Sequence, residues 1–345
     1  MIDDINNRAD KSLKAELVAN GGLVYSLNPI APAITRLNIT RELFRRHHEK
    51  VFIADNVAIV GSANITDEYS GPVYGSDDYM DLNIIMRNLC ISEVRNFFKE
   101  VADHYNHKLD REVSNEEIVQ KYNQIYPESI FNIPKLRLLQ AHPPHIEQIQ
   151  DFVLQQINSA QDSIRIIQPY YYPIKRFESV LLKALQRGVK VELLTAGKRH
   201  TSVYAPLKNS ILLNEMLKNG LQVYEIHDKL LHMKMYQFDD KIYTAGISTF
   251  FSKNLKNLGS FNNDRWSWDI DNELNVVVEN REEVSRMTNV FQAMKEMSKP
   301  IDPDMSIGFT RYCKIKFWDN FLLIAEWCSN KKRAFKTQRQ MEIHH

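Results

Sequence analysis

The chain has 345 residues, of which 43% are hydrophobic, so it can bury a large core and is long enough for two lobes. Its 44 Lys and Arg balance 43 Asp and Glu, and a net charge of +1 gives no reason to expect a polyanionic partner such as nucleic acid. Three scattered cysteines are too few for a disulfide framework or a zinc site. No apolar run of about eighteen residues occurs, so no membrane-spanning helix is predicted.

The first predicted elements are a helix end and a short strand within residues 16–27 (ELVANGGLVYSL), separated by an Asn-Gly pair that is typical of a helix C-terminus. The same pattern returns without a gap at residues 215–226 (EMLKNGLQVYEI), 199 positions later. A His-x-Lys-x4-Asp motif follows each stretch. Because the scaffold and the motif recur in the same order, we predict a duplicated fold.

The first copy of the motif is His48-x-Lys50-x4-Asp55. Apolar runs at 51–54 and 57–60 flank an Asp-Asn pair, which is typical of a tight β-hairpin. On a strand, residues two apart point to the same face, so His48 and Lys50 are expected to project together. Asp55 falls in the turn, where it fits a structural role better than a catalytic one.

Further along the chain, predicted helices at 146–159 and 174–186 alternate with predicted strands at 163–168 and 189–195. Residues 1–6 take the place of the second of these strands in the first copy, where the preceding helix, strand and helix have no counterpart. We therefore expect that about forty residues are missing ahead of the first copy and that one edge of its sheet is exposed.

The predicted fold class is α/β, with two similar lobes, each a mixed β-sheet flanked by helices, and an active site at the lobe interface. The first lobe is expected at residues 1–106, a polar linker at 107–144 and the second lobe at 145–298. A tail at 299–345 contains the aromatic-rich run 317–328 (FWDNFLLIAEWC), which either packs on the core or lies at a membrane surface.

Two histidines and two lysines suit the cleavage of a phosphodiester, an anion that repels nucleophiles unless positive charge surrounds its nonbridging oxygens. One neutral histidine can attack phosphorus and form a phosphohistidine, while the other, protonated, donates to the leaving oxygen. This chemistry predicts neither a metal nor a cofactor. The catalytic candidates are the six motif residues His48, Lys50, Asp55, His232, Lys234 and Asp239.

Phosphate-binding groups are expected beside each motif. In the first copy Ser62 and Asn64 of a Gly-Ser-Ala-Asn loop can donate hydrogen bonds to a phosphate oxygen. Two loops compete for this role in the second copy. The hairpin geometry favours residues 246–249 (GIST), whereas the residue types favour Ser260 and Asn262 of the later GSFN, with the residues between as an insertion.

The paired motifs resemble those of the phospholipase D superfamily, and within it the cardiolipin synthases most closely. The resemblance extends over residues 1–298. It includes the block 61–71 (GSANITDEYSG), the run 169–173 (PYYYP) and the run 259–273 (GSFNNDRWSWDIDNE).

This resemblance implies roles for further residues. Asp81 and Glu273 would be the carboxylates that orient the two histidines. His48 would act as nucleophile and His232 as acid and base. The implied substrate is phosphatidylglycerol or a similar phospholipid at a membrane surface, which would be the cytoplasmic membrane in bacteria or a mitochondrial membrane in eukaryotes.

Four functions are compatible with these residues. The first is a phosphatidyltransferase that joins two phosphatidyl groups and releases a small alcohol such as glycerol. The second is a phospholipase D-type hydrolase, in which water replaces the acceptor alcohol. A nuclease comes third, because the balanced charge provides no basic stripe for nucleic acid. A membrane-binding scaffold without activity is disfavoured by the intact histidines and lysines.

Overall fold

The structure is a computed structural model. It describes residues 2–3, 15–16, 18–21, 26–27, 49–54, 57–63, 79–87, 136–142, 146–169, 171, 175–197, 213–246 and 273–302. These residues form a nine-stranded sheet, a three-stranded sheet and two pairs of short strands.

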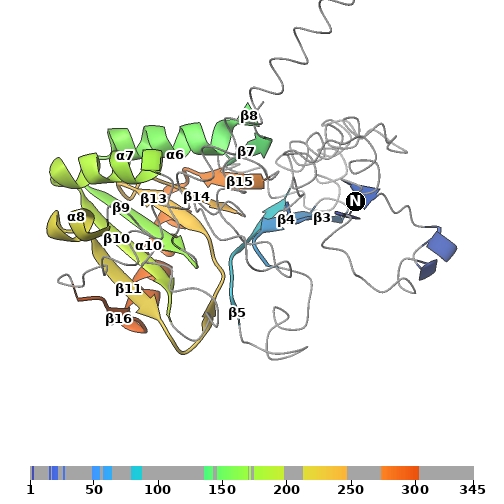
Figure 1. Ribbon diagram of the computed structural model, residues 1–345. Coiled ribbons are helices and arrows are strands. Elements are labelled where there is room, and N and C mark those ends of the chain that lie inside the picture. Colours follow the sequence, from blue (N-terminus) through green and yellow to red (C-terminus); the bar gives the residue numbers. More distant parts are fainter. Residues whose placement is uncertain are drawn as a thin grey trace, which may run out of the picture.

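The nine-stranded sheet occupies the C-terminal half and has the order β16-β11-β10-β9-β13-β14-β15-β7-β8 (Figure 1). Strands β9, β10 and β11 are parallel, and their other neighbours in the sheet are antiparallel. The elements of this half are β7 (Leu136–His142), β8 (Ile146–Glu147), α6 (Gln148–Ser159), β9 (Ser163–Gln168), α7 (Lys175–Gln186), β10 (Lys190–Ala196), α8 (Leu213–Lys218), β11 (Gln222–Ile226), β12 (Leu230–Leu231), β13 (Met235–Phe238), β14 (Ile242–Gly246), β15 (Glu273–Val278), α10 (Arg281–Glu296) and β16 (Lys299–Pro300).

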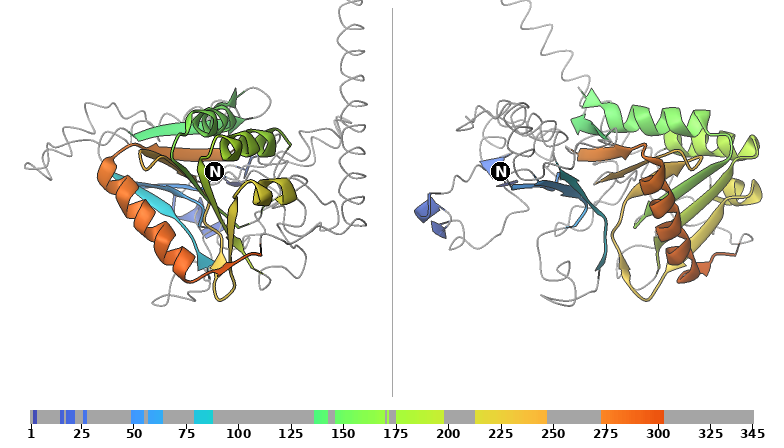
Figure 2. Two further views of the ribbon diagram at one scale, coloured as in Figure 1. Left: turned by 90° about the vertical axis from the view of Figure 1, so that its left-hand side faces the viewer. Right: turned by 180° about the vertical axis from the view of Figure 1, so that it is seen from behind.

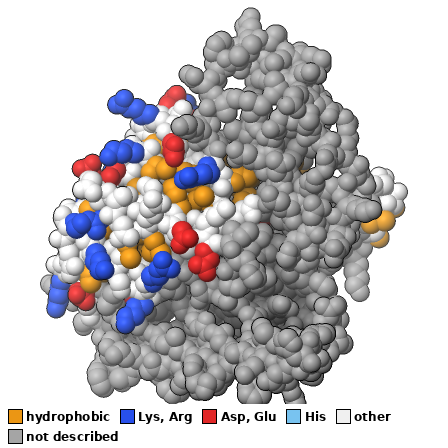
Figure 3. Space-filling view, turned by 90° about the horizontal axis from the view of Figure 1, so that it is seen from above, with side chains coloured by type: hydrophobic (Ala, Val, Ile, Leu, Met, Phe, Trp, Pro, Cys, Tyr) orange, Lys and Arg blue, Asp and Glu red, His pale blue; other side chains and the backbone are white. Residues whose placement is uncertain are grey.

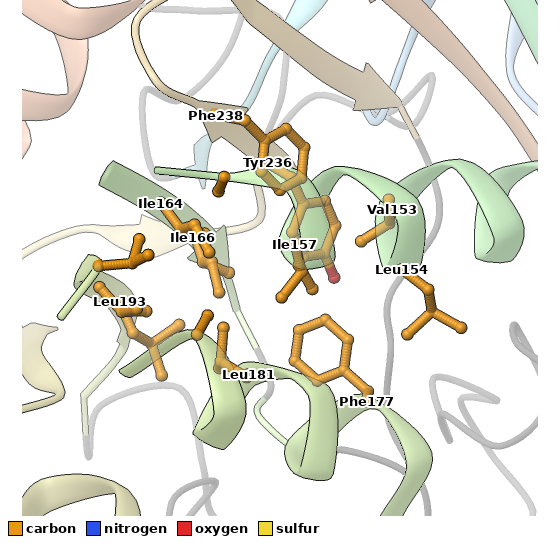
Figure 4. Packing of buried hydrophobic residues seen from close by; sticks show 14 of the residues in the cluster. Val153, Leu154, Ile157, Ile164, Ile166, Phe177, Leu181, Leu193, Tyr236 and Phe238 are labelled. Atoms are coloured by element: carbon orange, nitrogen blue, oxygen red, sulfur yellow. The ribbon is translucent and has the colours of Figure 1, made fainter. Parts of the chain in front are cut away.

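Helices cover both faces of this sheet. On one face α6 and α7 bury a cluster in which the rings of Phe177 and Tyr236 meet edge to face, 6.2 Å apart (Figure 4). On the opposite face lies α10, which turns Val284, Met287 and Phe291 toward the sheet at helical spacing (Figure 2). All six residues of β9 are buried, as expected for a central strand covered on both sides.

The three-stranded sheet consists of β3 (Val51–Ala54), β4 (Val57–Gly61) and β6 (Asn83–Arg87). It confirms the predicted hairpin, because β3 and β4 are antiparallel neighbours. Ala58, Val60 and Met86 project from one face of this sheet into the same hydrophobic cluster as α10, so the small sheet packs against the large one.

The repeated Asn-Gly stops have matching geometry. Asn20 and Asn219 each donate a backbone and a side-chain hydrogen bond to the carbonyl four residues earlier. Gly21 and Gly220 follow with φ of +83° and +94°, a conformation that favours glycine. Moreover, β1 (Ile2–Asp3) pairs in parallel with β2 (Ser26–Leu27), just as β10 pairs with β11. The internal repeat is therefore present in the backbone as well as in the sequence.

Comparison with the predictions gives one correction. The strand at 163–168 has the predicted bounds, and the other elements of the second copy differ by one or two residues. Residues 136–142, which we assigned to a linker, instead form β7 within the large sheet. The α/β class is confirmed, whereas the division into two similar lobes stays a prediction.

No helix among the described residues is long and apolar enough to cross a membrane. Figure 3 shows the described surface from above, where acidic and basic side chains are mixed and charges of one sign do not gather. The aromatic-rich run 317–328 lies outside the described residues.

Candidate active site

The second copy of the motif lies where the chain passes from β12 into β13. The first residue of β13 is opposite Ile167, near the carboxyl end of β9. His232 and Lys234 are thus at the edge of the sheet where its parallel strands end, the usual place for a site in open α/β sheets. The backbone N–H groups of His232 and Met233 both donate to the carbonyl of Met80, at 2.8 and 3.0 Å. Backbone hydrogen bonds therefore connect this segment to the first half of the chain.

Asp81 of the first half holds the ring of His232. Its Oδ2 lies 2.7 Å from His232 Nδ1, and both side chains are buried. Its Oδ1 accepts hydrogen bonds from the hydroxyl of Ser62 and, at 2.9 Å, from the N–H of Leu82. An ionised carboxylate can only accept hydrogen bonds, so Nδ1 must carry the proton and Nε2 keeps its lone pair. This fixes the tautomer that nucleophilic or basic chemistry requires.

His232 is neutral in the free protein. Burial lowers its pKa to about 3, assisted by the positive charge of Lys234 and only partly opposed by Asp81. Burial acts to raise the pKa of Asp81, but the hydrogen bond from His232 and the charge of Lys234 outweigh it and leave the pKa lowered. At neutral pH the site therefore holds a neutral imidazole beside an ionised carboxylate.

Lys234 projects to the same side as His232, as the spacing predicted. Its Nζ lies 2.9 Å from Nε2 and 3.0 Å from Nδ1 of the ring. Because Nδ1 already donates to Asp81, the ammonium can donate only to Nε2. A phosphate oxygen would compete for this ammonium and release the Nε2 lone pair for reaction.

The first copy contributes positive charge to the same place. The charge of Lys50 is among the causes that lower the pKa of His232, so the lysines of both motifs act on this histidine. His48 and Asp55 lie outside the described residues, and their roles stay predictions. Within the described part of the chain, no three His, Cys, Asp or Glu side chains gather closely enough to hold a metal ion.

The two hairpins that carry the lysines have equivalent backbones. Gly61 donates its N–H to the carbonyl of Lys50 at 3.3 Å, and Gly246 donates to the carbonyl of Lys234 at 3.4 Å. Lys50 therefore lies opposite Gly61 in the first hairpin, as Lys234 lies opposite Gly246 in the second. The turn of the second hairpin is one residue longer, which explains why the two copies are offset by 184 positions at lysine and by 185 at glycine.

Each glycine faces an asparagine on the next strand. A Cβ at Gly61 would collide with Asn83, and one at Gly246 would collide with Asn275, because the strands pair with these residues opposite. Two positions before each asparagine stands a carboxylate, Asp81 or Glu273. The sequence signal for this equivalence is the repeat of Asp-Leu-Asn at 81–83 as Glu-Leu-Asn at 273–275. Glu273 is buried at the position equivalent to Asp81.

The aspartate of the second motif has a structural role. The carboxylate of Asp239 accepts hydrogen bonds from the backbone N–H groups of Gln161, Asp162 and Ser163, at 2.8 to 3.2 Å. These bonds lower its pKa against the effect of burial and fix the loop ahead of β9 to the turn after β13. Its contacts support the structural role that we expected for Asp55 and do not support a catalytic one.

Ser62 also differs from the expectation. It is buried, and its hydroxyl donates a hydrogen bond to Oδ1 of Asp81. The carbonyl oxygen of Leu82 is a second acceptor, 3.3 Å from the Ser62 hydroxyl. Ser62 therefore positions the carboxylate that holds His232, and its hydroxyl proton is not directed to a phosphate. Three further phosphate-binding candidates, Asn64, Ser260 and Asn262, lie outside the described residues.

One contact of the site was not foreseen. The ring of Tyr79 meets that of His232 edge to face, at 6.1 Å and 88°. Tyr79 and Met80 form β5, which pairs in parallel with β12 just before the motif. No sequence periodicity predicts a two-residue strand, and the only indication in the sequence was that Tyr79 lies two residues ahead of Asp81.

Comparison with known proteins bears on this arrangement. Residues 153–295 match the family model described as cardiolipin synthase, PLD-like domain. This region is a PLD-like domain. The resemblance found in the sequence is thereby confirmed for the half of the chain that carries His232, Lys234 and Glu273.

Two cardiolipin synthases are similar to a longer part of the chain, which includes residues of the first half. Cardiolipin synthase B of Shigella flexneri is 25% identical over 291 residues, which are 79% of this chain and 65% of that protein. A cardiolipin synthase of Clostridium perfringens strain SM101 is 26% identical, over 72% of this chain and 51% of its own length. The chain thus spans about half to two thirds of these relatives.

A solved structure supports the fold. Phosphatidylserine synthase of Haemophilus influenzae Rd KW20 superposes with a TM-score of 0.55 at 14% identity, over 83% of this chain and 70% of that one. At this level of identity the likeness concerns the fold alone.

Proposed function

We propose that the chain is a phosphatidyltransferase that makes cardiolipin or a related phospholipid by phosphodiester exchange. The observation that carries the proposal is the buried, neutral His232, held by Asp81 on one ring nitrogen and by Lys234 on the other. The names of the similar proteins support a phospholipid as substrate.

The reaction would proceed in two displacements. Following the resemblance, His48 attacks the phosphorus of phosphatidylglycerol, the bond to the leaving glycerol oxygen breaks, and His232 protonates that oxygen. A hydroxyl of a second phosphatidylglycerol then gives its proton to His232 and attacks the phosphohistidine. The nitrogen–phosphorus bond breaks, and cardiolipin and free His48 result.

The pKa of His232 sets a condition on this assignment. With a pKa of about 3, His232 is unprotonated at neutral pH and has no proton to donate to the leaving oxygen. The bound phosphodiester must therefore raise the pKa of His232. An anion between Lys50 and Lys234 would do so, because it neutralises the two charges that lower this pKa and accepts the ammonium hydrogen bond. Glu273 would orient His48 as Asp81 orients His232, by the equivalence of their positions.

A direct test is to incubate the chain with phosphatidylglycerol in mixed micelles and to identify the products. Cardiolipin plus glycerol is the expected result, whereas phosphatidic acid would indicate the phospholipase D-type hydrolase. His232→Ala should abolish turnover, and His227→Ala is a matched control, since His227 pairs with Glu225 at 3.4 Å outside this network. Absence of any turnover by the wild-type chain would contradict the proposal.

Two further measurements refine the mechanism. Rapid quenching of His48→Ala and of His232→Ala with labelled phosphatidylglycerol should trap a phosphohistidine only where His48 is present. Trapping it on His232 instead would reverse the roles. Addition of a chelator should leave turnover unchanged, because lysines supply the positive charge that a metal would otherwise provide.

A further inference from the structure

Tyr79 lies between the imidazole of His232 and the solvent. The two rings meet edge to face, with 6.1 Å between their centroids. Tyr79 is partly exposed, whereas His232 is only 3% exposed. Asp81 and Lys234 also contact the imidazole, and their side chains are buried. Of these three contacts, the tyrosine ring is therefore the one that reaches the surface.

The backbone of β5 places this ring. Residues two apart in an extended chain project to the same side, so Tyr79 and Asp81 both point toward His232. Met80, between them, packs against the hydrophobic cluster that α10 buries, and its carbonyl accepts the backbone N–H groups of the histidine segment. The two residues that follow Tyr79 are thus both bonded to this segment, and the position of the tyrosine ring follows from them.

The cover over His232 has an electrostatic effect. Burial is the largest cause that lowers the pKa of His232, to about 3, because a buried imidazolium loses its hydration. The charges of Lys234 and Lys50 act in the same direction, and Asp81 opposes them. Because Tyr79 covers the solvent side of the ring, it contributes to this burial. A small side chain in its place should admit water and raise the pKa of His232.

Access of water matters in the second displacement of the proposed reaction. There the acceptor hydroxyl gives its proton to Nε2 of His232, and its oxygen bonds to phosphorus. The nitrogen–phosphorus bond breaks, and its electron pair returns to His48. Water that reaches Nε2 would take the same step and give phosphatidic acid. Exclusion of water from a site prevents this hydrolysis of a reactive intermediate.

We propose that Tyr79 is a specificity-determining residue, whose ring favours transfer over hydrolysis by keeping water away from His232. The inference rests on the proposed function, because it concerns the acceptor in that reaction. Tyr79 acts through the histidine and takes part in no bond that forms or breaks. The ring carries the effect, and the phenolic hydroxyl is not required.

The ratio of the two products tests the proposal. Wild type, Tyr79→Phe and Tyr79→Ala are incubated with phosphatidylglycerol in mixed micelles, and cardiolipin and phosphatidic acid are quantified. Tyr79→Ala should raise the ratio of phosphatidic acid to cardiolipin at least about fivefold, because water then reaches the histidine. Tyr79→Phe keeps the ring and should stay within about twofold of wild type. An equal rise in both variants would assign the effect to the hydroxyl and overturn the proposal.

The pKa of His232 is a second readout, which needs no turnover. The imidazole is titrated by NMR in the three free proteins, and its signals are assigned with His232→Gln. The pKa should rise by at least about one unit in Tyr79→Ala and stay unchanged in Tyr79→Phe. Displacement of Asp81 would lower it instead, because the hydrogen bond to Asp81 raises this pKa. The sign of the shift therefore separates entry of water from a structural disturbance of β5.

A second tyrosine serves as the control. Tyr224 of β11 is also partly exposed, and its ring lies 4.6 Å from the ammonium of Lys295. Tyr224→Ala should leave both the product ratio and the pKa of His232 unchanged. If Tyr79→Ala does not fold, Tyr79→Thr should give the same two changes, since threonine is well suited to a strand.

Two further results would overturn the proposal. An unchanged or lowered pKa of His232 in folded Tyr79→Ala would mean that the ring does not exclude water. A raised pKa with an unchanged product ratio would mean that water at the histidine does not decide the acceptor. If wild type gives no product at all, the proposed function and the preference for transfer both fail, whereas a raised pKa in Tyr79→Ala would still show that Tyr79 keeps water from His232.

Discussion

Replacing Asp81 by asparagine tests the arrangement around His232 with almost no change in shape. The carboxylate accepts from His232 at 2.7 Å, from Leu82 at 2.9 Å and from Ser62. An asparagine has one acceptor oxygen and an NH2 group, so at least one of these donors would face another donor. If the NH2 group faces His232, the ring changes tautomer and Nε2 loses its lone pair.

The magnitude follows from the loss of a buried hydrogen bond to a charged group, about 1.5–3 kcal/mol. If this stabilisation is needed at the transition state, Asp81→Asn should lower kcat roughly 10- to 160-fold, with KM nearly unchanged. The hydrogen bond to Asp81 raises the pKa of His232, so the variant should also shift the pH profile of kcat toward lower pH. A merely structural role for Asp81 would not shift this profile.

The assay is cardiolipin formation from phosphatidylglycerol over a range of pH, with circular dichroism as a check on folding. Asp151→Asn, which changes an exposed aspartate of α6, provides the matched control and should behave as wild type. A folded Asp81→Asn protein with wild-type kcat and an unshifted profile would refute the reasoning.

Three further predictions concern stability. Asp239→Ala should lower the free energy of unfolding, measured in urea, by about 1–3 kcal/mol, because three backbone N–H groups lose their acceptor. The kcat per folded molecule should change by less than about twofold. A large fall in kcat would instead indicate a catalytic role for Asp239. Glu192→Gln should destabilise by about 1–3 kcal/mol, because the buried carboxylate bonds Lys295 of α10, and an unchanged urea midpoint would show that this ion pair does not hold the helix. Between pH 6.5 and about 3 the unfolded chain protonates His232 while the folded chain does not, so stability should fall with pH by at most about 4–5 kcal/mol. His232→Gln should remove this part of the acid sensitivity, and equal sensitivity of both proteins would disprove it.

Local sequence patterns were sufficient to predict the elements that form from neighbouring residues. The strand at 163–168 has three isoleucines, interrupted only by Arg165, between polar ends. The first hairpin has a turn pair between two apolar runs. The strand at 136–142 was missed because it directly follows a polar segment with which we grouped it. Its place in the sheet depends on pairing with β15, far along the chain, and no local pattern reports such pairing.

In the candidate active site, too, local geometry was predictable from the sequence and distant partners were not. The spacing of His232 and Lys234 predicts that they project together, because the reason is the geometry of an extended chain. The partner of His232 lies 151 residues away, and only the resemblance to a family pointed to Asp81. The role of Ser62 could not be read from its loop, because a serine hydroxyl serves a phosphate or a carboxylate equally well.

The pairing of β5 with β12 gives the protein a built-in dependence between its halves. Only two residues of each strand take part, yet they set Asp81 and His232 opposite one another. A slip by a single residue would turn the side chain of Asp81 to the other side of its strand and leave the imidazole without its carboxylate. We therefore expect that neither half of the chain is active when it is expressed alone. Substitutions that weaken this short contact should abolish the proposed activity, although every residue proposed to be catalytic remains in the sequence.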